Sequence, residues 1–189
     1  MYAVKPLRYH PREANWQDFH HYLRDRSCHH LPSSTKPWLL DEGSLTQRLL
    51  KTTGGNFRVQ VLRQQWQRPR LSEQILLDMA PRDWGIIREV ALICNNEPWV
   101  FARSIIPARS LSGHLRQLRK FKDSSLGAML FSDPSLHRKP FQIAVIAGDD
   151  PQLPQHLHQS KPAWGRRSRF ELRGKPIMVS EVFLERFHP

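Results

Sequence analysis

The sequence predicts an α+β fold in which an antiparallel β-sheet carries helices packed on one face. Two stretches, 86–106 and 168–184, each contain two strand-like runs separated by a short turn-forming segment. Such short connections join antiparallel strands, because parallel strands need a longer crossover. The helical segments are short and do not alternate regularly with the strands, which argues against a doubly wound parallel sheet. With 189 residues, the chain has the length of one domain of roughly 100–200 residues.

The first 37 residues differ from the rest. They hold four prolines and five of the ten histidines. Apolar residues at near-helical spacing predict a short helix over about 15–24, and the segment 31–37 has the composition of a loop. We therefore expect residues 1–37 to be an N-terminal extension, loosely ordered or with a short helix. Residues 38–189 are then the folded domain.

The first part of this domain predicts a helix, a strand and a second helix. Ser44 and Gln47 have the spacing of a capping box, and the helix that follows should end at Gly54-Gly55. Alternating apolar and polar residues predict a strand over 57–61. A short helical segment is expected at 73–79.

The remainder predicts two hairpins with helices between them. The predicted elements are strands over 86–93 and 99–106 around the turn 95–98, helical segments over 112–120 and 125–131, a strand over 141–147, a loop over 149–162, and strands over 168–172 and 177–184 around the turn 173–176.

Composition limits the classes of function. The formal net charge is +12, so the chain should attract anions, whether nucleic acid, an anionic membrane or a small polyanionic metabolite. No apolar run approaches the roughly 18 residues of a membrane span, and the first residues do not form a secretory signal. We therefore expect a cytoplasmic protein without an integral membrane segment. Its two cysteines, Cys28 and Cys94, should be free thiols.

Charged residues interrupt apolar faces of the predicted strands. Arg88 shares a face with Val90, Glu181 shares one with Val179, and Arg103 repeats the pattern. Charges on a core face are costly unless paired. One interpretation is a buried Arg–Glu pair or charges near the solvent edge of the sheet, which the pattern alone favours. The other is a pocket in which arginine binds a carboxylate and glutamate handles a hydroxyl or a proton.

Other reactive residues have simpler interpretations. The N-terminal segment holds five potential metal ligands: His20, His21, Cys28, His29 and His30. Their spacing fits no common metal-ligand pattern, so no metal site is expected. Cys94 ends a strand and should be a small core residue. Basic residues cluster at 58–70, 116–122 and 166–175, and a solvated basic surface is favoured over a nucleic-acid site because no recognition motif accompanies them.

Several segments, in one order along residues 38–187, resemble the chorismate lyase family. They are Ser44-Leu45-Thr46-Gln47-Arg48, Ile87-Arg88-Glu89-Val90, Glu97-Pro98-Trp99, Ala102-Arg103-Ser104, Leu111-Ser112-Gly113, Ser125-Leu126-Gly127-Ala128-Met129-Leu130-Phe131, Trp164-Gly165-Arg166-Arg167-Ser168-Arg169, Gly174-Lys175-Pro176 and Ser180-Glu181-Val182-Phe183-Leu184. An ordered series is more specific than any isolated motif. The family position at Ala102 is usually glycine, and the family position at Leu45 is often methionine.

The resemblance implies an antiparallel sheet with flap-like segments over a buried ligand pocket. It implies conversion of chorismate to 4-hydroxybenzoate and pyruvate, the first committed aromatic step toward ubiquinone, with no metal or organic cofactor. We expect a monomer that binds these small molecules and no nucleic acid. Alternatives are a non-catalytic sensor of small aromatic acids with the same fold and, from the charge, a nucleic-acid binder.

The resemblance also implies roles for particular residues. Arg88 would bind the ring carboxylate, and the backbone amides of Leu45 and Leu126 would complete that carboxylate site. Glu181 would contact the ring oxygen. Arg103 is the position of a second family arginine that would bind substrate.

Overall fold

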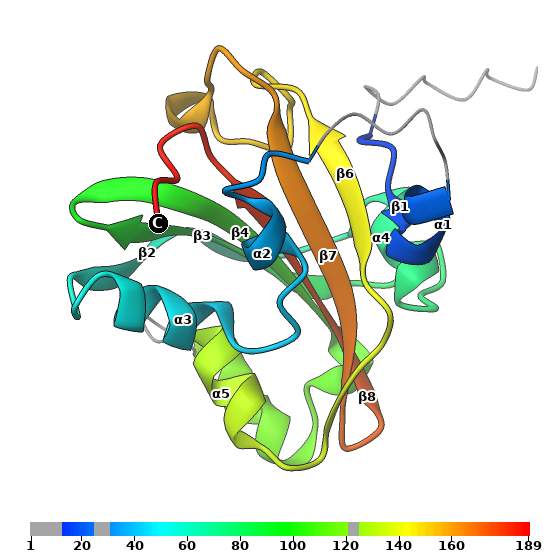
Figure 1. Ribbon diagram of the computed structural model, residues 1–189. Coiled ribbons are helices and arrows are strands. Elements are labelled where there is room, and N and C mark those ends of the chain that lie inside the picture. Colours follow the sequence, from blue (N-terminus) through cyan, green and yellow to red (C-terminus); the bar gives the residue numbers. More distant parts are fainter. Residues whose placement is uncertain (1–12, 25–30, 121–124) are drawn as a thin grey trace, which may run out of the picture.

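Residues 13–24, 31–120 and 125–189 are described by a computed structural model, which shows one antiparallel sheet with short helices (Figure 1). The sheet order is β1-β6-β7-β8-β4-β3-β2, and β5 pairs with β7 beside β6. All strand pairs are antiparallel, which confirms the predicted fold class.

Strands and helices alternate irregularly along the chain. The strands are β1 (Gln17–Asp18), β2 (Phe57–Gln67), β3 (Gly85–Cys94), β4 (Glu97–Pro107), β5 (Leu136–Arg138), β6 (Gln142–Ile146), β7 (Ala163–Leu172) and β8 (Lys175–Phe183). The helices are α1 (Phe19–Arg24), α2 (Lys36–Leu39), α3 (Leu45–Thr52), α4 (Leu71–Leu76) and α5 (Leu126–Ser132), with the 3₁₀ helices η1 (Ala108–Ser110), η2 (Gly113–Lys120) and η3 (Gln155–Leu157).

Both predicted hairpins are present, and their turns explain their tightness. Asn95 and Asn96 have φ of 50° and 66° between the paired residues Cys94 and Glu97. Positive φ at both central residues is the backbone of a two-residue turn that matches the twist of the strands. The β7–β8 hairpin turns in the same way at Arg173 and Gly174. The strands of this last hairpin are longer than the predicted 168–172 and 177–184.

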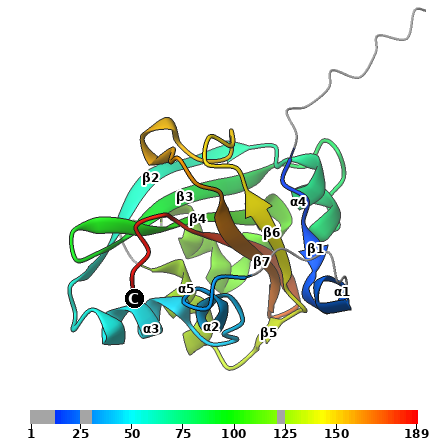
Figure 2. The ribbon, with the colours of Figure 1, turned by 45° about the horizontal axis from the view of Figure 1, so that its top comes forward.

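Both faces of the sheet centre are covered. Figure 2 shows α2, α3 and α5 on one side of the sheet, where their apolar residues pack on Ile86, Val90, Leu92 and Ala102. On the other face, the segment after α4 packs through Leu77 and Met79 on Ile87 and Ile105, and the 149–162 loop covers Ala91 and Ile93. Every residue of β3 is consequently buried. Charged side chains in β3 and β4 therefore need partners within the protein.

Part of the predicted N-terminal extension lies against the sheet. Within the predicted helix 15–24, Gln17 and Asp18 instead pair with β6, and α1 begins at Phe19. The ring of Phe19 stacks on Phe141 at 5.1 Å between centroids. These contacts tie the described residues before position 25 to the domain.

Candidate active site

The strand register places Arg88 and Glu181 on the same face of the sheet. Glu181 in β8 pairs with Ala102 in β4, and Ala102 pairs with Val90 in β3, two residues from Arg88. This is the face covered by α3 and α5. With strands about 4.8 Å apart and a rise of about 3.4 Å per residue, the Cα atoms of Arg88 and Glu181 lie about 12 Å apart.

Small side chains separate these two charged residues. Ala102 and Ser104 occupy the intervening positions of β4 on this face, and both are buried. Arg88 is 2% exposed, and its Nη1 donates a hydrogen bond to Gln64 Oε1 at 2.9 Å from β2. The arginine is thus fixed beside a floor of small residues.

Glu181 is paired with an arginine of its own. Arg166 is its register partner in β7, and Nε of Arg166 donates to Oε2 of Glu181 at 2.5 Å. Arg166 is 1% exposed. Within the described parts of the chain, Oε1 of Glu181 has no hydrogen-bond partner. The carboxylate is therefore held through one oxygen and keeps the other available.

Leu45 and Leu126 are the first residues of α3 and α5. Each helix has a serine N-cap: Ser44 Oγ accepts from the Gln47 amide, and Ser125 Oγ accepts from the Ala128 amide at 3.1 Å. The serine half of the capping box predicted at Ser44 is confirmed, and the described residues show no return bond from the Gln47 side chain to the Ser44 amide. First-turn amides have no acceptor inside their own helix. The Thr46 and Ser125 hydroxyls are hydrogen-bonded at 2.7 Å, so the two helix starts are side by side.

The segment between α2 and α3 is fastened by arginines from three places in the chain. Arg166 and Arg138 both donate to the carbonyl oxygen of Asp41, and Arg48 donates to its carboxylate at 2.8 Å. Burial opposes ionisation of Asp41, but bonds from the Gly43 amide and Arg48 outweigh it and keep its pKa below the usual range. The segment is consequently held against the sheet next to Glu181.

Arg103 lies on the opposite face from Arg88 and Glu181. It pairs in register with Glu89, and neighbouring residues of a strand point to opposite faces. Its guanidinium binds Glu73 at 2.7 Å and Glu89 at 2.5 Å. The structure therefore separates Arg103 from the other predicted site residues, and its carboxylate partners come from the protein itself.

Other sequence expectations had mixed outcomes. Cys94 is a buried free thiol, and burial raises its pKa to about 11. Cys28, His29 and His30 lie outside the described residues. No group of three or more potential metal ligands occurs within the described ranges.

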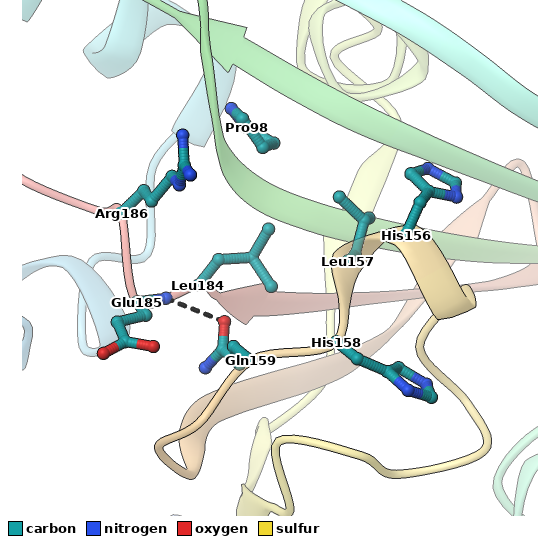
Figure 3. A pocket seen from close by; sticks show the side chains of 8 residues that line it. All are labelled: Pro98, His156, Leu157, His158, Gln159, Leu184, Glu185 and Arg186. Carbon is teal, nitrogen blue, oxygen red and sulfur yellow. Dashed lines mark hydrogen bonds between the residues drawn. The ribbon is translucent and has the colours of Figure 1, made fainter.

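A cleft of about 510 Å³ lies where the C-terminal segment meets η3 and the β3–β4 turn (Figure 3). Its lining includes Pro98, His156, His158 and Arg186. No predicted site residue lines it, so its size alone does not make it the active site.

The interpretation of 166–175 as a solvated basic surface is wrong for Arg166 and Arg167, which are both buried. Arg167 binds Gln142 and Ser72, and burial lowers its pKa to about 10. The period-2 pattern of the strand, which sets Arg166 on the same face as Ser168 and Phe170, was the available signal.

The chain thus folds as a small α+β domain, and one covered face of its sheet carries the buried Arg88 and the carboxylate of Glu181. An arginine and a carboxylate placed in this way are suited to bind a small anionic ligand. The family model described as chorismate lyase matches residues 13–188. The chain belongs to the chorismate lyase family.

Curated relatives agree with this assignment. A protein of Pseudomonas aeruginosa (strain UCBPP-PA14) named "Probable chorismate pyruvate-lyase" is 38% identical over 174 residues, covering 92% of this chain and 93% of the relative. A protein of the same name from Aromatoleum aromaticum is 34% identical over 184 residues, covering 94% and 96%.

Solved structures show the fold alone. The effector domain of PhnF from Mycobacterium smegmatis has a TM-score of 0.56 at 13% identity, covering 77% of this chain and 91% of that chain. The C-terminal domain of the histidine utilization repressor from Pseudomonas syringae pv. tomato has a TM-score of 0.54 at 12% identity, covering 70% and 94%. No helix in the described ranges has the length and apolar character of a membrane span.

Proposed function

We propose that this chain is a chorismate pyruvate-lyase, which converts chorismate to 4-hydroxybenzoate and pyruvate. One observation carries the proposal: Arg88 and Glu181 share one covered face across Ala102 and Ser104. The curated relatives bear that activity in their names. They do not favour the alternative of a non-catalytic sensor of aromatic acids.

In this proposal, Arg88 binds the ring carboxylate and Glu181 Oε1 accepts a hydrogen bond from the ring hydroxyl. The ligand then lies over Ala102 and Ser104, and the amides of Leu45 and Leu126 complete the carboxylate site. A guanidinium offers two parallel donors to a carboxylate, which fixes orientation as well as affinity. Arg103 is left out because its guanidinium is engaged on the other face.

The reaction depends more on the orientation of the substrate than on a strong acid or base. The ether bond between the ring and the enolpyruvyl group breaks, the ring loses a proton and becomes aromatic, and the enolpyruvate gains a proton to give pyruvate. Fixing the ring by both ends lowers the entropy cost of reaching this geometry, and exclusion of water strengthens the charged contacts. A ring hydroxyl hydrogen-bonded to Glu181 Oε1, as proposed, would let this carboxylate take part in proton transfer.

The finer parts of the assignment belong to the same proposal. We infer that the 4-hydroxybenzoate serves ubiquinone synthesis, and that the protein acts as a cytoplasmic monomer. Sedimentation of the purified chain tests the oligomeric state directly.

In the direct test, purified protein is incubated with chorismate, and the amounts of 4-hydroxybenzoate and pyruvate are measured together. We expect equal amounts of 4-hydroxybenzoate and pyruvate. Arg88→Ala should lower kcat/KM by at least about tenfold to a hundredfold, because a hydrogen bond to a charged group contributes about 1.5–3 kcal/mol. Arg88→Lys should lose most of the same activity because lysine cannot bind the carboxylate through two parallel bonds.

Arg58→Ala is the matched control, since Arg58 is an exposed arginine of the neighbouring strand β2. It should keep wild-type turnover. Tight binding of 4-hydroxybenzoate without turnover in the wild type would replace the enzyme by the sensor. Normal turnover in Arg88→Ala would remove Arg88 from the site.

A further inference from the structure

One buried guanidinium joins the proposed catalytic carboxylate to the segment that covers it. Nε of Arg166 donates to Oε2 of Glu181, while Nη1 lies 2.9 Å from the carbonyl oxygen of Trp38 and 3.2 Å from that of Leu39. The same Nη1 is 2.5 Å from the carbonyl oxygen of Asp41. The residues it bridges are far apart in sequence, so this contact exists only in the folded domain.

We infer that Arg166 is a positioning residue: it orients Glu181 so that Oε1 meets the ring hydroxyl, and it couples that orientation to the segment 38–41. This inference rests on the proposed function. The planar guanidinium has its donors in a fixed fork, so a carboxylate bound on one edge and carbonyls bound on another are held at a set angle. Arg166 touches no proposed ligand atom and acts through Glu181.

The surroundings make the orientation of Glu181 sensitive to this contact. Arg138, whose Nε donates to Ser168 at 2.9 Å and whose Nη1 donates to the Asp41 carbonyl, brings a second positive charge to the same place. Burial and the nearby charge of Arg166 lower the pKa of Arg138 to about 10. Glu181 thus lies near the half-buried Arg138 as well as the buried Arg166, and the bond from Arg166 decides which way its free oxygen points.

The test compares two ligands that differ only in the ring hydroxyl. Dissociation constants of benzoate and 4-hydroxybenzoate are measured for the wild type, Arg166→Lys, Glu181→Gln and the double variant. We expect the wild type to bind 4-hydroxybenzoate at least about tenfold more tightly, as for a hydrogen bond to a charged group. The hydroxyl ratio is the dissociation constant of benzoate divided by that of 4-hydroxybenzoate. In Arg166→Lys the hydroxyl ratio should fall to within about threefold of unity, while the dissociation constant of benzoate changes by less than about threefold.

The double variant shows whether the two residues act as one unit. If Arg166 works through Glu181, the ratio in the double variant should be no lower than in Glu181→Gln alone, because coupled residues are not additive. With chorismate, Arg166→Lys should lower kcat much more than it raises KM, since anchoring by Arg88 is kept.

Arg48→Lys is the control, because Arg48 binds the same segment through Asp41 and the Pro37 carbonyl. It should keep the wild-type hydroxyl ratio. Arg166→Gln, which keeps a donor in the strand, is the second variant if Arg166→Lys does not fold, and it should show the same loss. Turnover in the wild type with an unchanged ratio in either folded Arg166 variant would overturn this inference alone. A wild type that binds neither acid would overturn the proposed function and this inference with it.

Discussion

At the scale of single residues, Arg103 shows how a buried charge can be structural. Its guanidinium binds Glu73 and Glu89, and all three are buried. Removing one partner of a buried ion pair costs about 3–5 kcal/mol, because the remaining charges stay buried without compensation. We therefore expect Arg103→Met to lower the free energy of unfolding by about that amount, measured by urea denaturation.

The control for this variant is Arg63→Met, which removes an exposed arginine that contacts the same Glu89. Its cost should be only about 0–1 kcal/mol, because water screens and replaces the lost pairing. An Arg103→Met protein of wild-type stability that no longer binds 4-hydroxybenzoate would return Arg103 to the ligand site.

The ionisation of Glu73 makes the stability of the Arg103–Glu73–Glu89 cluster depend on pH. Burial opposes its ionisation, but the bonds from Arg103 and the Arg70 amide outweigh burial and keep its pKa below the ordinary 4.5. The unfolded chain therefore takes up the proton first as pH falls, so the stabilisation is complete above about 4.5 and is lost as pH drops through the folded-state pKa. In Glu73→Gln, we expect the unfolding free energy to vary less with pH in that range. An equal acid dependence in both proteins would contradict this origin.

At the scale of elements, one serine hydroxyl caps α5 and joins it to the start of α3. Ser125 Oγ caps the Ala128 amide and is hydrogen-bonded to Thr46. Ser125→Ala should lower stability by about 1 kcal/mol, a typical value for an N-cap. Thr46→Val keeps the cap and removes only the contact between the helices, so thermal unfolding should show a smaller loss. A larger loss in Thr46→Val would mean that the contact, rather than the cap, stabilises this junction.

Elements set by neighbouring residues could be predicted from the sequence, and those set by distant partners could not. The Asn95–Asn96 turn and the Ser44 cap are local, and both are present. The predicted strand 57–61 was too short, because β2 continues past a register shift between Val61 and Arg63 that breaks the alternation. The strands β1 and β5 have two and three residues and form only against β6 and β7.

The candidate site shows the same division. Alternation within a strand could mark Arg88 and Glu181 as charges on apolar faces. It could not give the register between strands, which sets Arg88 beside Ser104 and so puts Arg103 on the other face. The burial of Arg166 depends on carbonyls of α2 more than a hundred residues earlier in the chain, which no local pattern contains.

At the scale of the whole molecule, the net charge of +12 is much larger than the single positive charge that Arg88 contributes to the proposed site. Arg103 and Arg166 form buried ion pairs with glutamates, and the net charge already counts both partners of each pair. The excess of +12 creates a field around the protein that attracts anions regardless of their identity. Chorismate, a dianion, would feel this field before it reaches Arg88.

Because of this field, we expect added salt to slow the encounter of the protein with its substrate and to leave the chemical step almost unchanged. The Debye length falls from about 10 Å at 0.1 M salt to about 3 Å at 1 M, so added salt should lower kcat/KM for chorismate severalfold by weakening long-range attraction. The kcat at saturating substrate should change much less, because contacts with buried groups such as Arg88 are short and poorly screened. Steady-state kinetics in a salt series measures both. A kcat/KM independent of salt, together with strongly salt-dependent binding of an oligonucleotide, would instead assign the surplus charge to a nucleic-acid partner.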